Sequence, residues 1–257
     1  MKILDFSGKI ALVTGAAGAI GKAVVRQLKE NGAAVVITDL RAEQTSAAAE
    51  ELGVQGFAAD VTNAAEVEQV VKATLALHKR IDILVNVAGI VGQGVVEELT
   101  EEEWDRMFAV NCKGTFLFTK YVVPQMKANK YGKIINYSSK SGKTGSALMS
   151  HYCAAKGAII AFTQALAYEL ADYNINVNCV CPGITDNSGV WANVSAGYTQ
   201  NLKMPKDEVV RKFTAKIPLK RLATVQDVAS VTAFLASAGA DYMTGQAINI
   251  TGGREMH

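Results

Sequence analysis

The order in which apolar patterns recur along the chain is the feature that most restricts its fold. Short runs rich in β-branched residues alternate with longer stretches of helical periodicity. Strict alternation of strands and helices requires crossover connections, which produce a parallel sheet with helices on both faces. We therefore predict an α/β fold built on a doubly wound parallel sheet. The expected strands are 10–13, 34–37, 81–85, 133–137, 175–180 and 247–250, with a weaker candidate at 54–58, and helices are expected, for example, at 20–31, 64–78, 101–128, 150–173 and 225–236.

Nothing in the sequence divides this pattern into separate parts. The 257 residues contain no Pro/Gly/Ser linker, repeat or low-complexity segment, so we expect a single domain over 1–257. One irregular insertion, at about 184–218, follows a predicted strand and contains Trp191 and Tyr198. Ligands of open α/β sheets bind beyond the carboxyl ends of the strands, so the insertion is predicted to be a substrate lid. A surface loop without function is the alternative.

Composition and charge favour a small molecule as the ligand. The 26 basic and 24 acidic residues give a net charge of +2 without a basic cluster, which argues against nucleic acid or a membrane surface as partner. No stretch is long enough to span a bilayer, and the N-terminal residues, with an acid at Asp5, do not resemble a secretory signal. The four cysteines lack a disulfide framework spacing and the three histidines are scattered. We therefore expect a cytoplasmic protein with reduced thiols and no metal site.

A glycine-rich stretch follows the first predicted strand and leads into the first helix. Its glycines, Gly15, Gly18 and Gly21, have the spacing GxxxGxG. Small residues here allow backbone amides at a helix N-terminus to approach a pyrophosphate, and allow the helix to pack closely on the strand. A Gly/Ala-rich turn that only packs is the alternative. The position between strand and helix favours a dinucleotide site in a Rossmann-type sheet.

An acidic residue at the end of the second strand bears on which dinucleotide binds. Asp39 lies twenty-four residues after Gly15. A carboxylate at this place accepts hydrogen bonds from the adenosine ribose hydroxyls and repels a 2′-phosphate. Arg41 is the one nearby cation that could reach a phosphate, although it could equally lie over adenine or point to solvent. The sequence therefore favours NAD over NADP.

A tyrosine and a lysine in the predicted helix 150–173 are the candidates for acid/base chemistry. Tyr152 and Lys156 are four residues apart, so their side chains share one face of the helix. A free tyrosine loses its proton only near pH ~10, and a neighbouring cation is needed to stabilise its phenolate. By itself the pair is a weak signal, because a solvated Tyr–Lys contact has the same spacing.

These motifs together resemble the classical short-chain dehydrogenase/reductase family over nearly the whole chain, from 9 to 253. The resemblance rests on the glycine motif 14–21, Asp60-Val61, the strand end Asn86-Val87-Ala88-Gly89, Asn111, Ser139, the Tyr152/Lys156 pair and Pro182-Gly183.

The resemblance implies the catalytic set Asn111, Ser139, Tyr152 and Lys156. Tyr152 would exchange a proton with the substrate hydroxyl and Ser139 would hold the substrate oxygen. Lys156 would lower the pKa of the tyrosine and bind the nicotinamide ribose, and Asn111 would keep a water in a proton relay. Ser138 is the alternative serine, but Ser139 has the family's spacing of thirteen residues before Tyr152. The implied cofactor-binding residues are Gly15, Ala17, Gly18, Ile20, Gly21, Asp39, Leu40, Asp60, Val61, Asn86, Ala88, Gly89, Tyr152, Lys156, Ile184 and Asn187.

The sequence departs from the family pattern at two positions. Val87 replaces the second asparagine of the strand-end motif, and we expect its side chain to face the core. Asn187 stands near the place of a threonine that contacts the nicotinamide carboxamide. Asn187 could form a similar hydrogen bond, so the departure bears on how the lid holds NAD.

Two lysines beside the predicted catalytic serine bear on the substrate. Lys140 and Lys143 are either exposed, or one of them hydrogen-bonds a polyhydroxylated or phosphorylated substrate. The same segment is similar to short-chain hexitol and hexitol-phosphate dehydrogenases, which implies a polyol or sugar-derived substrate. The candidate substrate residues, chosen by position alone for the last three, are Lys140, Gln93, Trp191 and Asn193. His151 adjoins Tyr152, and we expect it to point away because helix neighbours do not share a face.

Other functions use the same residues. A 3-oxoacyl-thioester reductase or a small diketone reductase of the diacetyl/acetoin type would need the same catalytic set, although Asp39 argues against the NADP preference expected of the acyl reductase. A non-catalytic NAD-binding sensor would be expected to lack Ser139, Tyr152 or Lys156, all of which are present. The resemblance also implies a homotetramer assembled through the helices near 101–128 and 150–173, or else these faces only cover the sheet.

Overall fold

A parallel sheet forms the centre of the computed structural model, which describes residues 4–186, 188 and 205–257. Within these residues the sheet has seven strands in the order β3-β2-β1-β4-β5-β6-β7, and every neighbouring pair is parallel. The order reverses direction between β1 and β4, which is the place where Rossmann-type sheets bind their ligands. The strands are β1 (Ile10–Thr14), β2 (Ala34–Asp39), β3 (Gln55–Ala58), β4 (Ile83–Asn86), β5 (Gly132–Tyr137), β6 (Ile175–Pro182) and β7 (Ala247–Ile250).

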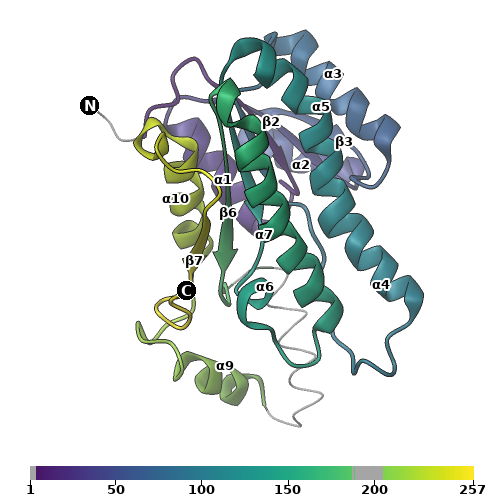
Figure 1. Cartoon of the computed structure of the whole chain (residues 1–257), viewed down its shortest axis with the longest axis vertical. Coiled ribbons are helices and arrows are strands. Elements are labelled where there is room, and N and C mark those ends of the chain that lie inside the picture. The colour runs from purple at the N-terminus through teal and green to yellow at the C-terminus, as the bar shows by residue number, and fades with distance from the viewer. Residues whose placement is uncertain (1–3, 187, 189–204) are drawn as a thin grey trace.

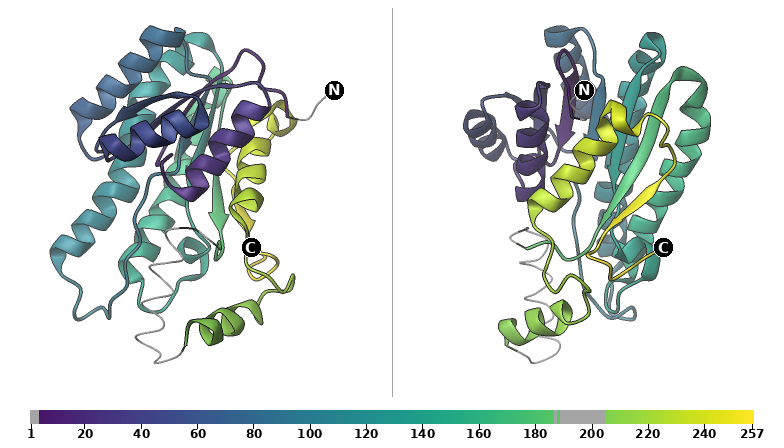
Figure 2. Two further views of the ribbon diagram at one scale, coloured as in Figure 1. Left: turned by 180° about the vertical axis from the view of Figure 1, so that it is seen from behind. Right: turned by 90° about the vertical axis from the view of Figure 1, so that its left-hand side faces the viewer.

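Helices cover both faces of this sheet, as Figures 1 and 2 show. One layer holds α1 (Ala19–Glu30), α2 (Ala42–Leu52) and α10 (Val225–Ala236). The other holds α3 (Ala64–His78), α5 (Gly114–Asn129) and α7 (Ser150–Leu170). Among the described residues, the remaining helical segments are α4 (Glu101–Phe108), α6 (Ser141–Thr144), α9 (Lys206–Thr214), the turn 109–113 and the short turns 171–173 and 238–240.

Alternation along each strand explains how the sheet supports both layers. In β1, Ala11 and Val13 belong to the core beneath α1 and α10, whereas Leu12 between them belongs to the core beneath α3 and α5. Successive side chains of a strand point to opposite faces, so a strand covered on both sides is apolar at most of its positions. The continuous apolar runs of the sequence are therefore the signature of a doubly covered sheet.

Side chains at the N-termini fix where several helices begin. Asn63 accepts hydrogen bonds from the first free amides of α3, and Thr100 and Thr224 form reciprocal capping boxes with Glu103 and Asp227 at α4 and α10. Helix α1 differs, because Gly18 at its N-cap offers no side chain and its first turn contains no acid. Its first amides therefore remain available to a ligand.

The predicted α/β class and parallel sheet are confirmed, including the weaker strand candidate at β3. The predicted helix 101–128 is instead interrupted, because residues 109–113 form a π-helical turn between α4 and α5. The predicted strand at 81–85 begins only at Ile83. Within the described part of the chain no helix is long and apolar enough to span a membrane.

Candidate active site

The glycine-rich turn between β1 and α1 lies at the carboxyl edge of the sheet. Gly15 has a φ of +64°, and a Cβ built on it would lie 2.7 Å from the backbone of Ala88. A Cβ on Gly21 would lie 2.6 Å from Ala16 Cα, so the helix packs too closely on the turn for any side chain. This uncapped cradle of small residues fits the pyrophosphate of a dinucleotide.

Asp39 is held against this turn from the end of β2. Its Oδ2 accepts a hydrogen bond from the Ala17 amide at 2.9 Å, and its Oδ1 accepts one from the Leu40 amide at 2.8 Å. The Leu40 side chain is exposed, as is Arg41. The carboxylate and the glycine turn therefore form one surface, as a site for an adenosine ribose and its pyrophosphate requires.

The other predicted cofactor residues at the strand ends are placed along the same edge. Asp60 accepts a hydrogen bond from the Thr62 amide through Oδ1, and Ala88 donates its amide to Thr14 Oγ1 at 3.1 Å. Val61 is buried and Gly89 is exposed.

Other predicted residues of the cofactor region do not present a free side chain to a ligand or are not described. Asn86 uses its side-chain amide inside the core, donating to Asn136 Oδ1 at 2.9 Å, so a cofactor contact there would come from its backbone. Ile20 and Val87 pack partly against the core beneath α1. Ile184 accepts a backbone hydrogen bond from Ala223 at 3.1 Å, while Asn187 lies outside the described residues.

Tyr152 and Lys156 lie together on the buried face of α7. The Lys156 Nζ is 5.7 Å from the centre of the Tyr152 ring and donates a hydrogen bond to the Tyr137 carbonyl at 2.9 Å. Burial raises the pKa of Tyr152 to about 12, opposed by its hydrogen bond with Ser139, and burial lowers the pKa of Lys156 to about 8. The sequence predicts a lowered tyrosine pKa, but in this structure the penalty for burying a phenolate is larger.

The two adjacent serines after β5 have different surroundings. Ser139 is hydrogen-bonded to Tyr152, and its Oγ also accepts the amide of Ser141 at 3.1 Å. Ser138 instead donates its hydroxyl to the Lys156 carbonyl at 2.7 Å, so it fastens the strand to α7. The structure therefore brings Ser139, not Ser138, to the tyrosine.

Asn111 is positioned by the π-helical turn that sequence analysis did not predict. Its Nδ2 donates to the carbonyls of Met107 at 3.0 Å and Ile90 at 3.1 Å, and its buried Oδ1 has no hydrogen-bond partner. A Cβ on Gly89 would lie 2.6 Å from that Oδ1 and 3.2 Å from Lys156 Nζ. Asn111 and Lys156 thus flank the same glycine, and the free Oδ1 fits an acceptor in a water relay.

Comparisons with known proteins agree with this geometry. The family model described as enoyl-(acyl carrier protein) reductase matches residues 15–255. Sorbitol dehydrogenase of Cereibacter sphaeroides is 37% identical over 98% of this chain and 100% of its own, and galactitol 2-dehydrogenase of Agrobacterium fabrum is 38% identical over 98% and 100%. A crystal structure of a variant actinorhodin polyketide ketoreductase with NADPH superposes with a TM-score of 0.93 at 34% identity, covering 97% of this chain and 98% of its own. The chain belongs to the short-chain dehydrogenase/reductase family. It is an oxidoreductase that acts on CH–OH groups with a nicotinamide cofactor.

The predicted substrate residues of this short-chain dehydrogenase/reductase are only partly described. Gln93 is half-buried, and its Nε2 has no hydrogen-bond partner. Lys140 is not a free surface lysine, because its Nζ donates to Ser146 Oγ at 2.8 Å and to the Gly145 carbonyl at 3.2 Å. A substrate would have to compete with these partners. Lys143 donates to the Ala247 carbonyl at 2.7 Å, and the predicted residues Trp191 and Asn193 lie outside the described residues.

His151 lies beside the site, and the side chain is almost completely buried. Its Nε2 lies where a Cβ on Gly92 would be 2.6 Å away, and its Nδ1 is buried without a partner. Burial lowers the pKa of His151, and Glu103 opposes that shift. The histidine therefore packs under the loop after β4, and the burial that disfavours its charged form could not be inferred from the sequence.

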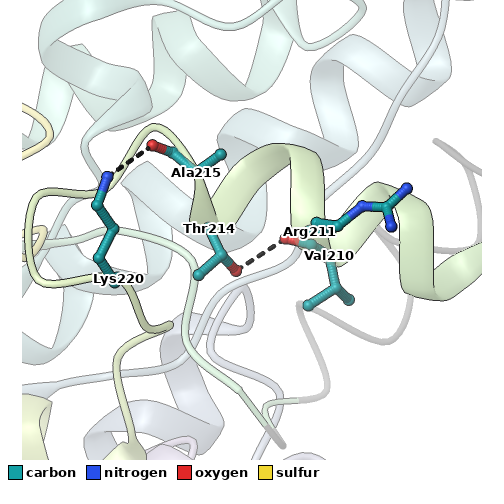
Figure 3. A pocket seen from close by; sticks show the side chains of 5 residues that line it. All are labelled: Val210, Arg211, Thr214, Ala215 and Lys220. Atoms are coloured by element: carbon teal, nitrogen blue, oxygen red, sulfur yellow. Dashed lines mark hydrogen bonds between the residues drawn. The ribbon is translucent and has the colours of Figure 1, made fainter.

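Helix α9 covers the catalytic cluster from the side of the predicted lid. Val210 and Phe213 on α9 pack against the buried group that contains Met107, Met149 and Tyr152. A shallow pocket of about 370 Å³ borders the same helix. Figure 3 shows the residues that line this pocket, which are Val210, Arg211, Thr214, Ala215 and Lys220. Thr214 donates a hydrogen bond to the Val210 carbonyl. None of the predicted site residues lines the pocket.

Proposed function

We propose that the protein is an NAD(H)-dependent dehydrogenase/reductase that interconverts a secondary alcohol and a ketone on a polyol or sugar-derived substrate. The observation that carries this proposal is the hydrogen bond between Ser139 and Tyr152, beside Lys156 and at the same edge as the glycine turn. An acid/base group, an oxygen-binding hydroxyl and a dinucleotide cradle in one place fit hydride transfer.

The chemistry assigns a separate step to each side chain. A nicotinamide cofactor held at the glycine turn would supply the hydride acceptor for the oxidation and the hydride donor for the reduction. Tyr152 takes the hydroxyl proton in the oxidation and donates it in the reduction, while Ser139 holds the substrate oxygen. Lys156 places a cation near the phenolate, and the unpartnered Oδ1 of Asn111 accepts from a water that carries the proton toward solvent.

Asp39 supports NAD as the cofactor. Its carboxylate is fixed at the glycine turn by the Ala17 amide, so a ribose 2′-phosphate at this place would meet a negative charge. Arg41 is exposed and could offset part of that repulsion. The NADPH of the superposed ketoreductase makes NADP the alternative.

The polyol substrate is supported by the sorbitol and galactitol dehydrogenases among the relatives. A 3-oxoacyl-thioester or small diketone reductase is the second candidate, and the polyketide ketoreductases among the similar proteins favour the former. Lys140 and Gln93 remain predicted substrate residues, together with Trp191 and Asn193.

Further proposals concern organisation and assembly. We propose one catalytic domain with residues 184–218 as its lid, because α9 packs against the cluster around Tyr152. Exposed aromatic side chains at Trp104, Phe116 and Tyr168 lie on α4, α5 and α7, which supports a homotetramer formed through these helices. The composition supports a cytoplasmic location and a small-molecule partner.

The deciding experiment follows nicotinamide absorbance with the purified protein. NAD and NADP are each offered with sorbitol, galactitol, pentitols and polyol phosphates, and NADH and NADPH with acetoacetyl thioesters and diacetyl. The proposal expects NAD-linked oxidation of a polyol, lowered by about 10²–10⁴ in Tyr152→Phe.

Tyr131→Phe is the matched control, because Tyr131 lies immediately before β5, at the opposite edge of the sheet. Its activity should equal that of the unaltered protein. Reduction of a thioester or diketone without polyol oxidation would replace the proposed substrate class and keep the mechanism. Full activity of Tyr152→Phe would refute the mechanism.

A further inference from the structure

The segment that follows β7 turns back on itself and is fixed to the sheet. Thr251 Oγ1 donates to the Glu255 carbonyl at 3.0 Å and accepts the Glu255 amide at 3.3 Å. Asn249 of β7 also donates its Nδ2 to the Glu255 carbonyl at 3.1 Å. These bonds hold the backbone of Glu255 beyond the carboxyl end of β7, at the edge where the active site lies.

The Glu255 side chain lies between two cations from distant parts of the sequence. Only 9% of it is exposed, and its Oε1 is 3.2 Å from Arg254 Nε and 4.0 Å from Lys140 Nζ. Its Oε2 and the Nη1 of Arg254 are both buried without a hydrogen-bond partner. A buried carboxylate is retained only where positive charge compensates its lost hydration, so these three groups depend on one another.

Lys140 connects this cluster to the turn that carries Ser139. It follows Ser139 directly, and its Nζ donates to Ser146 Oγ and to the Gly145 carbonyl. Ser146 is in turn hydrogen-bonded to Ser141 at 2.9 Å, and the Ser141 amide donates to Ser139 Oγ. Lys140 of the charge cluster and the Ser139 hydroxyl are therefore linked through the hydrogen bonds of Ser146 and Ser141. We call residues 139–146 the catalytic-serine turn.

Arg254 connects the same cluster to α9. Its guanidinium carbon is 5.4 Å from the centre of the Phe213 ring, a cation–π distance. Phe213 packs against the group that contains Tyr152, and Figure 1 shows α9 beside the C-terminal turn. Phe213 of α9 thus contacts both the buried group that contains Tyr152 and Arg254 of the Glu255 cluster.

We propose that Glu255 and Arg254 are positioning residues of the active site, which hold the catalytic-serine turn and α9 in a fixed relative position. The inference rests on the proposed roles of Ser139 and Tyr152. Glu255 is the central group, because without its carboxylate Lys140 and Arg254 would face each other as like charges. In agreement, burial and the Arg254 charge both lower the pKa of Lys140, and Glu255 opposes them.

Hydrogen–deuterium exchange of the full chain tests this coupling without requiring any substrate. In Glu255→Gln, amides of residues 139–146 and of 206–214 should exchange about threefold to tenfold faster, while amides of α3 should not change. Glu255→Asp should restore part of the protection. The matched control is Glu51→Gln, which removes a carboxylate paired with Lys22 and Arg26 on the opposite part of the molecule and should leave both segments unchanged.

Kinetics with sorbitol and NAD provide the second readout. Glu255→Gln should lower kcat severalfold and leave the KM for NAD unchanged, because the glycine turn is untouched. The Lys140→Met/Glu255→Gln double variant should lower kcat by less than the product of the single effects, since both substitutions break the same link.

The outcomes separate this inference from the proposed function. Unchanged exchange in both segments, or an equal increase throughout the protein, would overturn the coupling, as would a change in only one segment. If the unaltered protein fails to oxidise sorbitol, the proposed substrate is wrong, and the exchange experiment still decides the positioning role.

Discussion

Replacing Lys156 with methionine should inactivate the enzyme and yet stabilise its fold at neutral pH. Burial lowers the pKa of this lysine from 10.5 to about 8, so keeping it charged at pH 7 costs about 3 kcal/mol by linkage. Methionine has a similar length and no charge to bury. It also loses the hydrogen bond to the Tyr137 carbonyl, which costs about 1–3 kcal/mol. The variant should therefore be more stable by about 1 kcal/mol at pH 7.

The same reasoning predicts how the difference depends on pH. Between about pH 8 and 10.5 the unfolded chain holds a proton on Lys156 that the folded protein has released. The unfolded state binds more protons than the folded state in this window, so the contribution of Lys156 to the free energy of unfolding rises with pH. This contribution is lost again as pH falls through 8. The variant lacks this contribution. Above pH 8, the free energy of unfolding of the unaltered protein should therefore rise relative to that of the variant by about 1.4 kcal/mol per pH unit. The unaltered protein should be the more stable of the two from about pH 9.

Urea unfolding of both proteins at pH 7, 8, 9 and 10, followed by circular dichroism, measures this difference. Groups without a charge interaction with Lys156 titrate alike in both proteins and cancel, and Tyr152 of the folded protein, with a pKa of about 12, stays protonated throughout. The same comparison between Tyr152→Phe and the Tyr152→Phe/Lys156→Met double variant controls for coupling between the Tyr152 and Lys156 side chains. A stability difference that stays constant from pH 7 to 10 would refute the burial argument, whatever its size.

Three further substitutions test other parts of the structure. Asp39→Ser should lower kcat/KM with NAD and raise kcat/KM with NADP. The ratio of these two kcat/KM values should shift by about tenfold or more toward NADP. An unchanged ratio would show that the carboxylate does not select the cofactor. Gly15→Ala should destabilise the protein by about 1–3 kcal/mol and weaken NADH binding, because the position has a positive φ and no room for a Cβ. Denaturation measures the first effect and fluorescence titration the second. At Gly18 the nearest atom to a Cβ is 3.4 Å away, so alanine should be tolerated there in the apo fold. Asp241→Asn should destabilise the protein more than Lys133→Met does. The aspartate substitution leaves the buried lysine without its carboxylate partner at 2.6 Å, whereas the lysine substitution removes the buried charge itself. The reverse order of unfolding midpoints would contradict this.

Much of the fold and site follows from patterns that are local in the sequence. The apolar runs predict the strands because both faces of a doubly covered strand are largely apolar, and the glycine turn is predicted because a close helix N-terminus excludes side chains. Tyr152 and Lys156 share a helix face at a spacing of four residues. Asp39 and the glycine turn are predicted separately, and the parallel register of β1 and β2 brings them together.

Other features could not be predicted, because they depend on what surrounds a side chain. The π-helical turn that aims Asn111 lies in a stretch with ordinary helical periodicity, and only its packing against α7 distinguishes it. The sequence suggests Asn86 as a cofactor contact, but the neighbouring strand supplies Asn136 and draws its amide into the core. Lys140 likewise looks like a solvated or substrate-binding lysine until Glu255 is placed beside it.

The sequence by itself determined the α/β class and the glycine-rich turn, since backbone sterics and helix or strand periodicity act over a few residues, while the proposed catalytic set came from the resemblance to the family. The tertiary structure alone decided the protonation properties and the partners of those residues. Burial raises the pKa of Tyr152 and lowers that of Lys156, and the Lys156 ammonium is held by the Tyr137 carbonyl, nineteen residues away. Desolvation and Coulomb interactions depend on every atom packed around a group, and the carboxylate that faces Lys140 comes from Glu255, more than a hundred residues away.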